Sequence, residues 1–163
     1  MNKLTLSFTI LLFSSLICSV SCRAQMESPS PFLKGFSLAE TVKRMNVAEV
    51  GDISGGSSGG VSANAPTSRR NEYDDLFTIV ESKIENFDER DFLSKLNQQL
   101  GNEISNAGLK ITGSGTGGDS FYIDYESSQF KGGIDVIGIR AAKDKYRVWC
   151  VVRELAFGET QKL

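Results

Sequence analysis

Residues 88–126, DERDFLSKLNQQLGNEISNAGLKITGSGTGGDSFYIDYE, contain the point where the chain changes from helix to strand. Asp88 is a suitable N-cap, and Gly108 suits the position just after a helix. Between them, apolar side chains recur at steps of three and four, as on one face of a helix: Phe92, Leu93, Leu96, Leu100, Ile104 and Ala107. Beyond Gly108 the apolar period falls to two, which is typical of strands.

Four strands are predicted after this helix. They cover residues 109–112, 121–126, 134–141 and 146–155, and the last two are joined by a turn at residues 142–145. Short connections of this kind favour an antiparallel meander.

A second helical stripe precedes Asp88, formed by Tyr73, Leu76, Phe77, Val80, Ile84 and Phe87. It points to the opposite side from the later stripe, so we expect a break at Asp88 and two separate helices. The predicted fold class is α+β: two amphipathic helices followed by a four-stranded antiparallel meander, with both helices packed on one sheet face. The globular domain is expected to span residues 72–157.

The first residues predict where the protein works. Lys3 precedes an apolar run that ends in small residues, which is the layout of an export signal. Residues 19–22, SVSC, resemble the lipobox of bacterial lipoproteins, although Ser19 stands where an aliphatic residue is usual. That resemblance implies a signal of residues 1–21 and acylation of Cys22. Ordinary cleavage after Ala24 is the alternative, with a signal of residues 1–24.

Residues 25–70 are predicted to be largely a disordered tether. Within them, Ser37 and Glu40 make a capping-box pattern that favours a short helix over residues 38–46. A Gly/Ser linker follows at residues 51–64. Residues 158–163 form a tail.

The composition excludes several kinds of function. The chain has no histidine, so it holds no Ser-His-Asp triad, Cys-His dyad or histidine metal site. Its net charge of −2 argues against a nucleic-acid binder, which normally carries a basic excess. Once the signal is removed, Cys150 is the one cysteine left for the fold, and its apolar neighbours indicate a buried side chain. We expect no catalytic residue, no metal and no cofactor.

Two patterns resemble catalytic motifs without the context that they need. Residues 113–118 match GxGxxG, but a dinucleotide site requires a helix next, and a strand follows here. We therefore expect a flexible hairpin loop. Asp124 and Glu126 share one strand face, and a small hydrolase could use such a pair if a substrate cleft held it.

The last strand predicts a partner-binding face. Alternation puts Arg147, Trp149 and Arg153 on one side, opposite an apolar row that faces the helices. Trp and Arg dominate many interfaces, and we add Tyr122 to this candidate site. Six bases against two acids between residues 131 and 153 favour an anionic partner.

Together these features predict an exported, non-catalytic domain that binds an unknown protein or anionic partner in the cell envelope or extracellular space. Membrane contact is expected only through the signal peptide or a lipid on Cys22. Two alternatives stay open: a hydrolase using Asp124 or Glu126, and a purely structural envelope protein. A deep cleft at these carboxylates would favour the hydrolase. A sheet face covered by residues 32–50 would favour the structural role.

The first prediction concerns export. The apolar run after Lys3 should be removed, so protein from the native host should begin at Cys22 or at Gln25. Intact-mass spectrometry distinguishes the two, because acylation of Cys22 adds the mass of its lipid. A mass that retains residues 1–21 would contradict removal of the signal.

Overall fold

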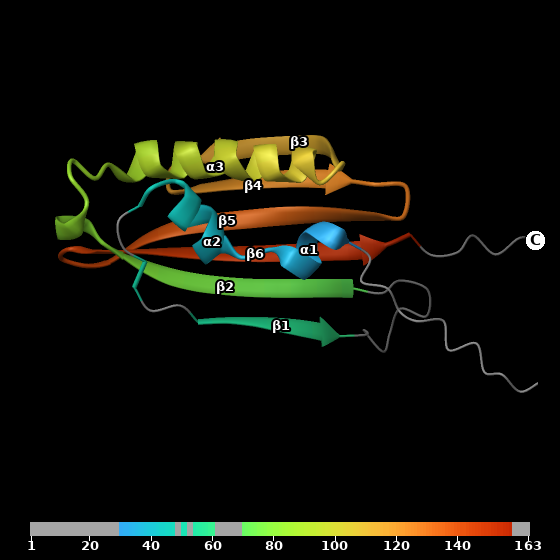
Figure 1. The fold of residues 1–163 in the computed structure, drawn as a ribbon, viewed down its shortest axis with the longest axis horizontal. Helices are drawn as coiled ribbons and strands as arrows, with labels where there is room; N and C mark the ends of the chain where they lie inside the picture. Colours follow the sequence, from blue (N-terminus) through green and yellow to red (C-terminus); the bar gives the residue numbers. More distant parts are fainter. Residues whose placement is uncertain (1–29, 48–49, 52–53, 61–69, 158–163) are drawn as a thin grey trace, which may run out of the picture.

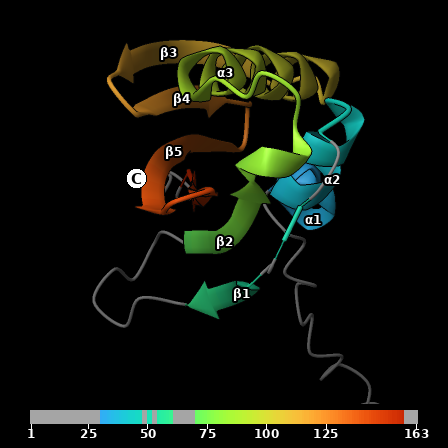
Figure 2. The same ribbon diagram turned by 90° about the vertical axis from the view of Figure 1, so that its left-hand side faces the viewer.

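An antiparallel sheet with helices on one of its faces makes up this α+β fold (Figures 1 and 2). The computed structural model describes residues 30–47, 50–51, 54–60 and 70–157. Six strands follow one another in the order β1-β2-β6-β5-β4-β3. The predicted signal peptide, Cys22 and the tail at residues 158–163 lie outside the described residues.

Two short helices come first among the described elements, and a long helix lies between the second and third strands. The helices are α1 (Pro31–Gly35), α2 (Leu38–Arg44) and α3 (Glu89–Asn106), with a single 3-10 turn at Glu81–Lys83. The strands are β1 (Ser54–Gly60), β2 (Arg70–Val80), β3 (Lys110–Gly117), β4 (Ser120–Glu126), β5 (Phe130–Ala142) and β6 (Lys145–Ala156).

Helix α3 confirms the predicted helix after Asp88. The Asp88 side chain accepts a hydrogen bond from the backbone N–H of Asp91 at 2.8 Å, which caps the first turn. Gly108 follows the helix with a φ of 77°, a conformation that glycine adopts without strain. Ala107 is the exposed C-cap, whereas the other five residues of the predicted apolar stripe form the buried face of the helix: Phe92, Leu93, Leu96, Leu100 and Ile104.

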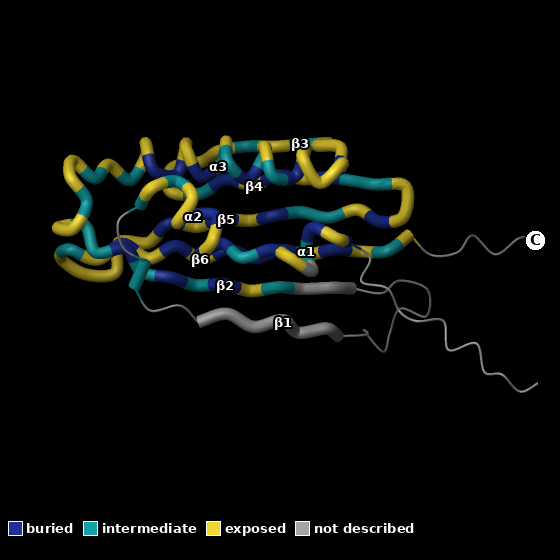
Figure 3. The backbone as a smooth tube through the Cα atoms, viewed as in Figure 1, coloured by how far each residue is buried: buried dark blue, intermediate teal, exposed yellow. Residues whose placement is uncertain are grey.

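The predicted four-stranded meander is present as β3–β4–β5–β6. Asp144 makes the tight β5–β6 turn with a φ of 66°. Buried and exposed positions alternate along β4, along β5 as far as Ile139 and along most of β6 (Figure 3). This alternation gives the sheet one face under the helices and one open face.

The predicted helix from Tyr73 to Phe87 is wrong, because most of that segment is strand β2. It pairs with β6 along its whole length, from Arg70 opposite Leu155 to Val80 opposite Lys145. Phe77 and Ile79 are fully buried at alternate positions, with a period of two rather than 3.6. Burying Phe77 and Ile79 against the helices stabilises the strand, although the other apolar residues of the segment are spaced as in a helix.

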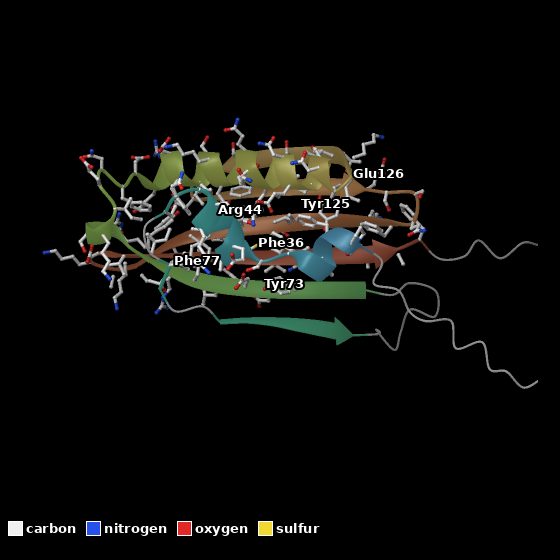
Figure 4. All side chains as sticks on the ribbon, viewed as in Figure 1. Phe36, Arg44, Tyr73, Phe77, Tyr125 and Glu126 are labelled. Carbon is white, nitrogen blue, oxygen red and sulfur yellow. The ribbon has the colours of Figure 1, made fainter. Side chains whose placement is uncertain are left out.

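The segment before β1 packs into the core, which differs from the tether expected there. The capping box does start a helix, since Ser37 accepts a hydrogen bond from the Glu40 N–H and α2 follows. Leu38 and Val42 of this helix are fully buried. The ring of Phe36, just before this helix, packs edge-on against the ring of Tyr73, with 5.8 Å between the ring centroids (both labelled in Figure 4). Residues 72–157 therefore do not contain the whole core.

Part of the expected Gly/Ser linker is also regular structure. Strand β1 pairs antiparallel with β2, from Ser54 opposite Leu76 to Gly60 opposite Arg70, and forms one edge of the sheet. Glycine and serine have low strand propensity, so the pairing depends on the exposed edge of β2.

The GxGxxG segment lies mostly within strand β3, and not in the hairpin loop expected there. Strand β3 runs on to Gly117, and the turn begins at Gly118. Gly115 stands directly opposite Tyr122, and a Cβ on this glycine would lie 2.5 Å from the tyrosine ring. A side chain at this position would require the Tyr122 ring to move, so the glycine allows the ring to lie over β3.

The second prediction tests whether α2 belongs to the core. Leu38→Ala removes a fully buried side chain and should lower the free energy of unfolding by about 2–5 kcal/mol. Lys43→Ala, on the exposed side of the same helix, is the control and should change it by less than about 0.5 kcal/mol. Urea unfolding measures both. Equal, small effects would mean that α2 does not pack on the sheet.

Candidate binding face

Strand β6 places the predicted site residues on the open face. Arg147, Trp149 and Arg153 are exposed, whereas Val148 and Val152 on the opposite side are fully buried. The strand alternates in this way because one row can enter the core beneath the helices and the other cannot. The orientation expected from the sequence is therefore confirmed.

Residues of neighbouring strands lie beside Trp149 in rows that cross the sheet. The Trp149 row contains Leu76, Trp149 and Ile137, which stand directly opposite one another. On one side, the acidic row contains Asp74, Val151, Asp135 and Tyr122. On the other side, the Arg147 row contains Thr78, Arg147 and Ile139.

Apolar side chains are unusually exposed on these rows. Trp149 is 39% exposed and Tyr122 is 44% exposed, and Ile137 and Ile139 are similarly open. A shallow groove of about 740 Å³ runs over Ile137 and reaches from Trp149 and Arg153 to Tyr122 and Gly115. Tyr122 therefore belongs to the same surface as Trp149, although β5 separates their strands. Contiguous exposed apolar surface of this kind is typical of an interaction site.

The charges of this face are mixed. Trp149 donates its indole N–H to the Asp74 carboxylate, and Arg153 lies 3.4 Å from Asp135. At the far end, Lys110 pairs with Glu126 at 3.0 Å. Among residues 73–157, whose side chains the structure describes, the open face holds five bases (Lys110, Lys131, Lys145, Arg147, Arg153) and four acids (Asp74, Asp124, Asp135, Glu126). A face so close to neutral gives little preference for an anionic partner.

The basic excess counted along the sequence does not gather on this face. Arg140, one of the six bases, bonds to Glu81 and Glu89 and faces away from Trp149. Asp74 and Asp124, which lie outside the counted stretch, come onto the face from β2 and β4.

Asp124 and Glu126 lie on the open face at its β3–β4 end. They line a shallow groove of about 440 Å³ together with Lys131 and Arg153. The Asp124 carboxylate sits beside Gly113 and Gly133, where a Cβ would approach it to 3.2 and 3.0 Å. The two acids share an open surface rather than the deep cleft that hydrolysis of a bound substrate would need.

Sequence reasoning missed two buried carboxyl groups on the helix side of the sheet. Asp75 accepts hydrogen bonds from the Leu38 N–H at 3.2 Å and the Tyr73 hydroxyl at 3.5 Å. Glu154 accepts the Tyr125 hydroxyl at 2.8 Å. Burial raises the pKa of both carboxyl groups, although these hydrogen bonds act in the opposite direction. The one sequence signal that could have predicted Asp75 and Glu154 on the buried face is the alternation of side chains along β2 and β6.

Asp75 and Glu154 attach the N-terminal helices to the sheet. Asp75 holds the first residue of α2, and Glu154 bonds to Ser30, the N-cap of α1. Cys150, beside Asp75, is fully buried, and burial raises the pKa of its thiol, as expected for a small core side chain.

Within the described ranges, no group of three or more Asp, Glu or Cys side chains is placed to hold a metal ion. None of the helices described is both long and apolar enough to cross a membrane. No family model and no curated protein matches this chain.

The third prediction concerns Glu154. A carboxyl group with a raised pKa stabilises the fold when protonated, and this contribution is lost as the pH rises through the folded-state pKa. Glu154→Gln keeps an acceptor for Tyr125 but cannot ionise. The variant should therefore gain stability relative to the wild type as the pH rises above about 4.5, the ordinary pKa of a glutamate. Urea unfolding at several pH values measures the difference. A constant difference across this range would contradict the raised pKa.

Proposed function

We propose that the protein is an exported, non-catalytic module that binds a partner through its open sheet face. The observation that carries this proposal is the Trp149 row, where an aromatic and two aliphatic side chains lie exposed or partly exposed between the row that contains Asp74 and Asp135 and the row that contains Arg147. An apolar centre with a polar rim is the usual anatomy of a protein interface. Trp, Tyr and Arg, which supply most interface hot spots, are all present here.

The arrangement of the helices supports this proposal over a purely structural role. All described helices, including residues 31–44, lie over the buried face of the sheet (Figures 1 and 2). Trp149, on the opposite face, is exposed. An uncovered apolar row costs solvation free energy in the isolated domain. A binding partner gives this row a function.

The hydrolase is the weaker candidate. Glu126 is engaged with Lys110, and the groove that holds both acids is open to solvent. An acid–base pair works best where water is excluded and one carboxyl is held protonated. The shape of this groove favours contact with a surface over enclosure of a small substrate.

Export and lipid attachment remain part of the proposal. Their support is the apolar run after Lys3 and the lipobox-like residues before Cys22. On either processing route the module works outside the cytoplasm, in the envelope or in the surrounding medium.

The fourth prediction tests the binding face. The double variant Trp149→Ala, Arg147→Ala should lose partner capture from envelope extracts while the fold survives, because both side chains are exposed. Capture is measured by affinity purification and mass spectrometry, and folding by circular dichroism.

The matched control is the double variant Ile111→Ala, Lys143→Ala. Ile111 is 39% exposed, as Trp149 is, and lies on the helix side of β3 opposite Tyr125, while Lys143 lies in the β5–β6 turn. This control should keep full capture. Equal capture by both variants would contradict a role for the open face.

A further inference from the structure

The pattern of the open face is complementary to itself. The apolar Trp149 row runs through the centre, with the acidic row on one side and the Arg147 row on the other. Arg147 stands on β6, and the two acids Asp74 and Asp135 stand on the strands at either side of β6. A surface with opposite charges at equal distances from an apolar axis can pair with a copy of itself.

We propose that the partner of this face is a second copy of the chain, packed sheet against sheet about a twofold axis along the Trp149 row. This proposal rests on the proposed function, because both use the same face. A half turn about that axis places Trp149, Leu76 and Ile137 against their own copies. It also exchanges the two flanking rows, so that Arg147 of each copy lies between Asp74 and Asp135 of the other.

The charges select this axis over the other simple choice. A half turn about the direction of β6 would place Asp74 against Asp135 of the second copy, since these two acids lie at equal distances from β6. Two carboxylates held together in this way repel. Rotation about the Trp149 row instead gives Arg147 of each copy two acidic neighbours. It also brings Arg153 of each copy opposite Lys145 of the other, but nearer the ends of the strands. Among the residues whose side chains the structure describes, Arg147 has no acidic side chain within ion-pair distance in its own chain.

The available area suits a reversible dimer. Strands β2 to β6, spaced about 4.8 Å apart and about 30 Å long, present on the order of 700 Å² to a facing sheet. A standard interface buries roughly 800 Å² on each partner. Two antiparallel sheets pack face to face at about 30°, so contact is closest near Trp149 and weaker toward the ends of the strands. We therefore expect dissociation in the micromolar range.

Charge reversal gives a test that is specific to this geometry. Arg147→Glu places a carboxylate between two others in the dimer, and Asp135→Lys places an ammonium against Arg147. Each variant alone should dimerise at least about tenfold more weakly than the wild type. An equimolar mixture of the two should recover a heterodimer. In that heterodimer the introduced carboxylate of one variant meets the introduced ammonium of the other, and the remaining native Arg147 meets the remaining native Asp135.

Sedimentation velocity on protein from cells that express the full-length gene measures the dissociation constants. Lys143→Glu carries the same charge change as Arg147→Glu in an exposed turn and should dimerise as the wild type does. A dimer that ignores both reversals, or a mixture that stays monomeric while the wild type dimerises, overturns this geometry.

A monomer at all concentrations also overturns the self-association. If that monomer still captures another protein in a Trp149-dependent manner, the proposed function stands without self-association. A monomer that captures nothing contradicts both proposals.

Discussion

Burial of every second side chain of β6 under the helices is the constraint on which the rest of the structure depends. Tyr146, Val148 and Cys150 in this row are fully removed from water, and β2 and β5 continue the row on either side. Successive side chains of a strand point to opposite faces of the sheet. When one row of side chains is buried in the core, the alternate row must therefore lie on the other face. The exposure of Trp149 is therefore a consequence of how the core is built, and no separate adjustment of the fold is needed to display it.

The elements that could be predicted from the sequence are those whose local signals agree with their burial. In α3, the cap at Asp88, the apolar stripe and Gly108 all indicate one helix, and the structure has it. Strand β2 was mispredicted because its buried row contains Asp75. A buried carboxylate interrupts the apolar alternation on which a strand prediction relies, and the remaining apolar residues then fit a helical period.

The rest could not be predicted because it depends on contacts between distant segments. Local pattern identifies the short helix after Ser37, but its burial depends on Asp75, Tyr73 and Glu103, which are far along the chain. The same limit applies to the candidate site. The position of β2 beside β6 brings Asp74 next to Trp149 and changes the charge of the face. Alternation within β6 was sufficient to orient its own side chains, and insufficient to identify their neighbours.

Fluorescence of Trp149 tests the central claim most directly, because it is the single tryptophan of the chain. The measurement is quenching by acrylamide in the folded protein, over a range of protein concentrations. If the open face is bare in the monomer and pairs with itself, quenching should be efficient in dilute solution and should weaken as the concentration rises. Strong protection of Trp149 in the dilute folded protein would contradict this account, because it would place the row in the core.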